Sequence, residues 1–157
     1  MLADVVSKNG NLLINVVQYP EGDLPPESRT FLREMAAWMK VNGEAIHGTR
    51  PWAVFGEGPT EPEEGAFKEG AQYTAKDIRF TAKGDVLYAT ALGQPRGELP
   101  IAALGRSEPH ERRAVKSVHL LGRAAPLQFT QSDRALLIRV PAALPTKHAS
   151  SFRIAFA

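Results

Sequence analysis

The feature that most constrains this chain is a short apolar run at residues 11–17, with the sequence NLLINVV. Its apolar residues do not alternate with polar ones, which is typical of a strand covered on both faces, as in a parallel sheet. Such a strand needs paired edges and a layer on each face. We therefore expect residues 11–17 to belong to a larger sheet than this sequence supplies.

Helices are predicted on both sides of this strand. The first helix ends at Lys8-Asn9-Gly10, because Asn and Gly tolerate the left-handed conformation at a helix C-terminus. The second covers residues 24–42, where apolar residues recur with a 3.6-residue period. These residues are Leu24, Phe31, Leu32, Met35, Trp38 and Met39. Helix, strand and helix form half of a repeating β/α pattern, which cannot close a domain alone.

From residue 73 onward the pattern becomes all-β. Residues 78–81 and 86–92 flank Lys83-Gly84-Asp85 and predict a hairpin. Further strands are expected at residues 98–101, 115–121, 127–130, 135–140 and 152–156. Short strands separated by turn residues indicate an antiparallel β-sandwich. Residues 55–72, rich in Gly, Pro and Glu, are predicted to be a linker or long loop, in which clustered carboxylates are usually solvated.

The composition excludes several function classes. The chain has 157 residues and a net charge of +2, too small an excess to indicate a nucleic-acid or membrane partner. It contains no Cys, so disulfides and thiolate metal sites are excluded. No apolar run approaches the roughly 18 residues of a membrane span. The four His residues have no metal-ligand spacing, and we expect neither a metal nor another cofactor.

Several motifs carry a resemblance to a known family. They are SKNGNLLIN at residues 7–15, WMKVNGEAIHGTRPW at 38–52, GEGPT at 56–60, IRFT at 78–81, GDVLYA at 84–89 and VHLLG at 118–122. In this order they resemble the C-terminal part of the α-L-fucosidases of glycoside hydrolase family 29. The resemblance implies the end of a (β/α)8 barrel followed by a C-terminal β-sandwich. It assigns residues 1–54 to the barrel, 55–72 to a linker or long loop, and 73–157 to the sandwich.

The resemblance also implies an activity. Members of the family hydrolyse terminal α-linked L-fucose with retention, using an Asp nucleophile and a Glu acid/base about 5 Å apart. Both acids lie on barrel strands upstream of the residues present here. The chain alone is therefore expected to be inactive and accessory, with no catalytic residue. Fucosylated glycans are expected to be its partners only through the intact enzyme. A secreted or periplasmic parent would carry any signal peptide upstream.

Three residues are expected near the substrate in an intact barrel. Barrel active sites lie at the C-terminal ends of the strands, which places Asn15, Gln18 and Tyr19 at the rim if residues 11–17 form the eighth strand. The alternative for all three is ordinary loop packing. Trp52 is expected to fill the junction between barrel and sandwich, with contact to a ligand as its alternative.

Two other functions stay open from the sequence. The sandwich resembles carbohydrate-binding modules in fold type and could bind sugar by itself. Alternatively, the chain is the non-catalytic half of a split fucosidase, whose barrel is a separate chain. An aryl α-L-fucoside assay, calorimetry with fucosylated glycans and co-purification distinguish these hypotheses.

Overall fold

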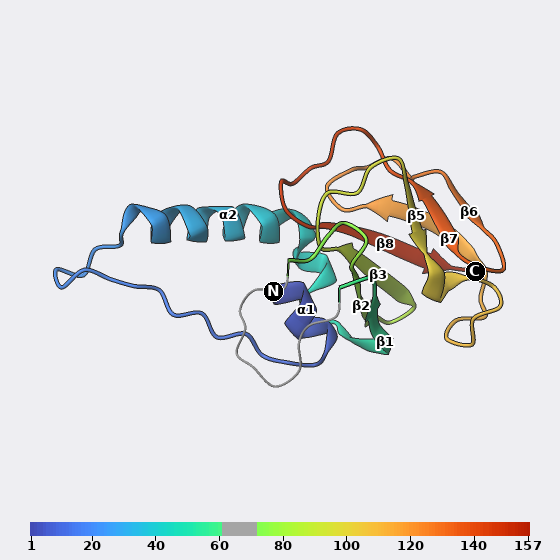
Figure 1. Cartoon of the computed structure of the whole chain (residues 1–157), viewed down its shortest axis with the longest axis horizontal. Helices are drawn as coiled ribbons and strands as arrows, with labels where there is room; N and C mark the ends of the chain where they lie inside the picture. Colours follow the sequence, from blue (N-terminus) through green and yellow to red (C-terminus); the bar gives the residue numbers. More distant parts are fainter. Residues whose placement is uncertain (61–71) are drawn as a thin grey trace.

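The computed structural model describes residues 1–60 and 72–157, which form an N-terminal helical part and a β-rich part (Figure 1). The helices are α1 (Leu2–Ser7), α2 (Pro26–Asn42) and the 3-10 turns η1 (Gly43–Ala45) and η2 (Ala102–Leu104). The strands are β1 (Arg50–Glu57), β2 (Ile78–Lys83), β3 (Val86–Ala91), β4 (Glu98–Ile101), β5 (Val115–Leu120), β6 (Phe129–Gln131), β7 (Leu136–Arg139) and β8 (Ser150–Phe156). None of the helices in the described ranges has the length and apolar character needed to cross a membrane.

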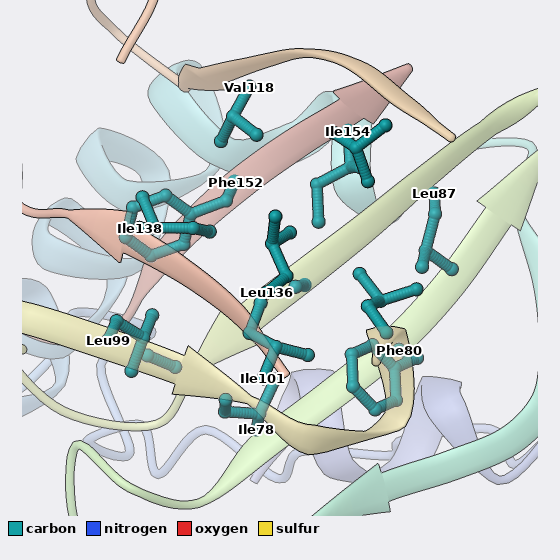
Figure 2. Close-up of a cluster of buried hydrophobic side chains, with 14 of the residues drawn as sticks. Ile78, Phe80, Leu87, Leu99, Ile101, Val118, Leu136, Ile138, Phe152 and Ile154 are labelled. Atoms are coloured by element: carbon teal, nitrogen blue, oxygen red, sulfur yellow. The ribbon is translucent and has the colours of Figure 1, made fainter. Parts of the chain in front are cut away.

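The strands form two antiparallel sheets that share one core. The larger sheet has the order β1-β2-β3-β8-β5 and the smaller has the order β4-β7-β6. Side chains of both sheets point toward each other, among them Phe80 and Ile154 from the larger and Ile101 and Leu136 from the smaller (Figure 2). All four are fully or almost fully buried. The predicted fold class is mainly β, an antiparallel β-sandwich preceded by the last β/α segment of a (β/α)8 barrel. The mainly antiparallel β architecture is confirmed.

The predicted hairpin is present as β2 and β3. Gly84 occupies the turn with a φ of 57°, a left-handed conformation that a residue without Cβ adopts at little cost. The expected strands at residues 98–101, 115–121, 127–130, 135–140 and 152–156 correspond to β4–β8, with ends shifted by a few residues. The helix stop at Lys8-Asn9-Gly10 is also confirmed, because α1 ends at Ser7 and Asn9 has a φ of 62°.

The predicted strand at residues 11–17 is wrong for this structure. Residues 10–19 form no strand, and Leu13 and Val17 are 86% and 68% exposed. Side-chain exposure still alternates along the segment, with Leu12, Ile14 and Val16 less exposed than their neighbours. The physical reason is that a strand exists only when a neighbour accepts its backbone hydrogen bonds. The described residues supply no such neighbour here.

The predicted linker begins too early. Residues 55–57 belong to β1, which pairs with β2 at the edge of the larger sheet after an irregularity between Pro51 and Gly56. A Cβ at Gly56 would lie 2.3 Å from the carbonyl oxygen of Ile78, so this close approach requires glycine. Residues 61–71 of the predicted linker lie outside the described residues.

Trp52 contributes to the sandwich. Its ring meets the ring of Phe80 edge-on, with 5.1 Å between centroids, and packs against the shared core. Trp52 is half-buried there, and the expectation that it also fills a junction with a barrel stays a prediction.

Candidate functional site

The three residues predicted to lie near substrate occupy the connection between α1 and α2. This connection, residues 8–25, loops away from the sandwich and returns through α2 (Figure 1). Asn15, Gln18 and Tyr19 are all exposed, Tyr19 by 47%. A local turn holds Tyr19, whose N–H donates to the carbonyl of Asp23 at 2.8 Å. The structure brings none of the three into a pocket, and their role at an active-site rim stays a prediction.

A pocket of about 510 Å³ lies between the helices and one end of the sandwich. Its lining is mainly apolar and comes from Met1, Leu2, Ala3, Leu12, Phe31, Glu34, Met35, Trp38, Tyr73, Leu92, Gly93, Gln94, Lys147, His148 and Ala149. Glu34 and His148 approach to 3.4 Å across it. The apolar stripe of α2 predicted one wall, whereas no sequence pattern indicated the walls at residues 92–94 and 147–149.

A buried ion pair attaches α1 to the sandwich. Arg79 of β2 is 4% exposed, and its Nε donates to the carboxylate of Asp4. The guanidinium also lies 5.5 Å and 5.0 Å from the ring centroids of Phe55 and Tyr73. Burial opposes ionisation of Asp4, but hydrogen bonds and charges from Arg79 and Lys8 outweigh it and lower the pKa of Asp4. Asp4 is therefore held as a carboxylate.

Hydrogen bonds attach the C-terminal end of α2 to β8. The Trp38 indole N–H donates to the carbonyl of Ala149 at 2.9 Å, and Asn42 Oδ1 accepts from the Ser151 N–H at 3.1 Å. Trp38 and Asn42 are 8% and 1% exposed and are the buried residues of this helix. The rest of the stripe is open, with Phe31 40% exposed. α2 is thus held at one end and uncovered along most of its length.

Polar groups also connect η1 to the sandwich. The Thr81 hydroxyl donates to the carbonyl of Ala45 at 2.7 Å. The Tyr88 hydroxyl donates to Glu44 at 2.7 Å, and Arg153 Nε lies 3.3 Å from the same carboxylate. Burial, with the hydrogen bond to Glu44, raises the pKa of Tyr88 to about 12. Tyr88 is therefore a neutral donor at physiological pH.

Asp77 joins the two chain segments on either side of residues 61–71. Its carboxylate accepts from the backbone N–H and hydroxyl of Thr60, both at 2.9 Å, and from those of Thr74 at 2.6 Å and 2.8 Å. The residue has no exposed surface. Burial favours the neutral acid, but these four hydrogen bonds prevail and lower the pKa of Asp77.

The carboxyl groups of the described residues that have a clear pKa shift are not suited to act as a general acid. A general acid needs a raised pKa, which comes from an apolar pocket. The carboxyl groups in the described ranges with a clear shift are Asp4, Asp77 and Glu111, and all three have lowered pKa values. No cluster of three or more His, Cys, Asp or Glu there is suited to hold a metal ion. The ionised carboxylates of Asp4 and Asp77 instead hold chain segments together.

Comparison with known proteins identifies the origin of this arrangement. A family model described as Alpha-L-fucosidase matches residues 1–44, and one described as Alpha-L-fucosidase C-terminal domain matches residues 71–156, more than half of the chain. An alpha-L-fucosidase of Branchiostoma floridae is 31% identical over 91% of this chain and 28% of its own length. The plasma alpha-L-fucosidase of Rattus norvegicus is 33% identical over 89% of this chain and 27% of its own length.

Solved structures of alpha-L-fucosidases are similar to this chain as well. The Thermotoga maritima alpha-fucosidase in complex with a mechanism-based inhibitor superposes with a TM-score of 0.72 at 28% identity, covering 98% of this chain and 32% of that one. Alpha-L-fucosidase isoenzyme 1 from Paenibacillus thiaminolyticus gives a TM-score of 0.70 at 28% identity, covering 99% and 32%. The chain spans less than a third of the length of these relatives. It therefore belongs to the alpha-L-fucosidase family of glycoside hydrolases and corresponds to the C-terminal part of those proteins.

Proposed function

We propose that this chain is the C-terminal portion of a retaining exo-α-L-fucosidase that hydrolyses terminal α-linked L-fucose. Family membership and the alpha-L-fucosidase names of the relatives support the substrate class. In this proposal the sandwich and its attached helices are accessory. The nucleophile and the acid/base come from a catalytic barrel, in the same polypeptide or in a separate chain.

The observation that carries the proposal is the uncovered apolar surface of the helical part. Large apolar side chains of residues 11–19 and of the first half of α2 face solvent, namely Leu13, Val17, Tyr19, Phe31 and Leu32. Clustered exposed apolar groups of this kind mark a surface that another protein element covers. The sandwich buries its own core, so the need for a cover is greatest in the helical part. A barrel that pairs residues 11–17 as a strand and packs on α2 satisfies this need.

The proposal makes the isolated chain inactive, because retaining hydrolysis needs two carboxyl groups about 5 Å apart with different pKa values. The described carboxyl groups with shifted pKa values are committed to hydrogen bonds that keep them ionised. The test is hydrolysis of 4-nitrophenyl α-L-fucoside by the purified chain. We expect no release of 4-nitrophenol above that of a heat-inactivated sample. Turnover that is lost when a carboxylate within residues 1–157 is changed would refute the proposal.

The partner is tested separately. Co-expression with the polypeptide encoded immediately upstream is expected to give a complex that hydrolyses the aryl fucoside. The matched control is the same complex with Leu13 and Phe31 changed to Asp, which places charges on the surface to be covered and is expected to prevent assembly. Absence of a complex with the upstream polypeptide counts against a barrel partner.

A further inference from the structure

The outer face of the larger sheet is polar and nevertheless buried. Strand pairing aligns Arg79, Thr90 and Ser151 in one row across β2, β3 and β8. Thr81 and Tyr88 begin the next row. These five residues are between 0% and 4% exposed. The outward face of a sandwich is usually polar and solvated. This face is polar as expected, but other segments of the chain cover it.

The cover consists of short segments held by directional contacts. Over the first row, Asp4 of α1 pairs with Arg79, and Asn42 at the end of α2 accepts from the Ser151 N–H. Over the second row, η1 receives hydrogen bonds from Thr81 and Tyr88. Apolar contact depends little on direction, whereas a buried donor without its acceptor costs free energy. Each covering segment therefore has one favoured position on the sheet.

We infer that the sandwich acts as a positioning domain, with Arg79 as the residue that fixes α1 and, through it, one end of residues 8–25. α1 has six residues, too few to be stable without docking. Residues 8–25 begin at α1 and end at the N-terminal end of α2, which lies away from the sheet (Figure 1), so the contacts of α1 with the sheet set the first end of the segment that carries Asn15, Gln18 and Tyr19. Arg79 is thus a positioning residue and touches no substrate. Only the link to an active-site rim rests on the proposed function.

Arg79 suits this role because its contacts are satisfied from several elements at once. Its Nε pairs with Asp4 of α1, and its Nη1 donates to the Ile78 carbonyl at 3.0 Å. Its guanidinium also lies over the rings of Phe55 and Tyr73. A planar cation that donates to two acceptors from different nitrogens is not replaced by Lys without loss. Removing the guanidinium leaves the partly buried Asp4 paired only with Lys8, at the end of α1 itself, so α1 loses its ion pair with the sheet and its release is favoured.

The experiment is amide hydrogen exchange by NMR on the full chain, which needs no activity. In the unchanged protein we expect measurable protection at Val5 and Gly10, whose N–H groups donate within the α1 region. Arg79→Met keeps the aliphatic stem and is expected to reduce this protection at least tenfold. Protection of the amides of β3 and β8 should stay within about twofold of that in the unchanged protein, because the sandwich core is intact. Arg79→Lys is expected to restore part of the protection.

The matched control is Arg139→Met, which removes an exposed guanidinium from β7 and is expected to leave α1 unchanged. An α1 that exchanges equally fast in the unchanged protein and Arg79→Met would overturn the inference, as would an equal loss of protection throughout the sandwich. These outcomes are independent of the fucosidase assay. If the barrel complex is active, Arg79→Met should in addition raise KM more than it lowers kcat, whereas Arg139→Met should change neither.

Discussion

Asn42, the last residue of α2, accepts a hydrogen bond from the backbone N–H of Ser151 in β8, with 3.1 Å between Oδ1 and N. The two residues are 109 positions apart and are 1% and 0% exposed. Asn42 Nδ2 also donates to the carbonyl of Trp38 at 3.3 Å. One amide side chain therefore ends the helix and fixes that end on the sheet.

Changing Asn42 to Ala should destabilise the chain. The variant leaves the Ser151 N–H buried without an acceptor, which costs about 1–3 kcal/mol. Urea unfolding monitored by tryptophan fluorescence gives the free energy of unfolding. Asn11→Ala is the control, because Asn11 is exposed and its loss should cost less than about 0.5 kcal/mol. Equal losses in the two variants would contradict the structural role of Asn42.

Changing Asp77 to Asn should also destabilise the chain at neutral pH. The carboxylate accepts four hydrogen bonds from Thr60 and Thr74. An amide of the same shape has one acceptor oxygen and presents an N–H₂ group to donors. We expect a loss of about 2 kcal/mol in the free energy of unfolding at pH 7. Asp133→Asn, at an exposed position, should leave the free energy of unfolding unchanged. An Asp77→Asn variant as stable as the unchanged protein would contradict the prediction.

The stabilisation by Asp77 should depend on pH in one direction. Its folded-state pKa lies below the ordinary value of 3.8, so the unfolded state binds the proton more readily. The contribution is then fully present above the unfolded-state pKa and is lost as pH falls through the folded-state pKa. The difference in unfolding free energy between the unchanged protein and Asp77→Asn should be constant above about pH 5 and shrink below about pH 4. A difference that grows on acidification would reverse the sign and contradict the assignment.

The uncovered apolar segment should promote self-association of the isolated chain. Leu13 and Val17 are 86% and 68% exposed, and burying them between two copies removes apolar surface from water at about 25 cal/mol per Å². Changing both to Ser should lower the average mass measured by light scattering at high protein concentration. The free energy of unfolding should change by less than about 0.5 kcal/mol. Ser substitutions at the exposed Arg134 and Arg139 are the control and should leave the mass unchanged.

The sandwich should not bind fucosylated glycans by itself. Most exposed large apolar residues of the described chain precede β1, and the ring of Phe55 in β1 has Lys8 and Arg79 over it at 5.0 Å and 5.5 Å. A sugar-stacking platform needs an open aromatic face, and these two cations compete with a sugar for the ring of Phe55. Isothermal calorimetry at millimolar fucosylated trisaccharide should detect no binding heat. Heat that disappears in Phe55→Ala would restore the carbohydrate-binding alternative.

The sandwich was largely predictable from local sequence. Alternation of apolar residues over 78–92 and the turn at Gly84 determine both the hairpin and its inward face, since strand period and turn geometry are local properties. The same local patterns did not predict β1, because Pro51, Gly56 and Gly58 are residue types that are typical of linkers and turns. Gly56 is instead required by a backbone approach to Ile78, which only the three-dimensional arrangement reveals.

The contacts between the two parts could not be predicted in the same way. Alternation places Arg79 and Thr81 on the outer face, but their cover comes from Asp4 and Ala45, distant in sequence. The apolar run at residues 11–17 predicted a strand with neighbours on both edges, and the strand prediction failed because pairing depends on those neighbours. The role of Asn15, Gln18 and Tyr19 depends on the same missing contacts and stays a prediction.

The order of strands in the larger sheet has a consequence for biosynthesis. β8 lies between β3 and β5, although both precede it in the chain (Figure 1). During translation, β3 and β5 cannot be joined in one sheet until β8 has left the ribosome. The inner edges of β3 and β5 therefore stay unpaired while the intervening strands are made, and such open edges are exposed to wrong partners during folding.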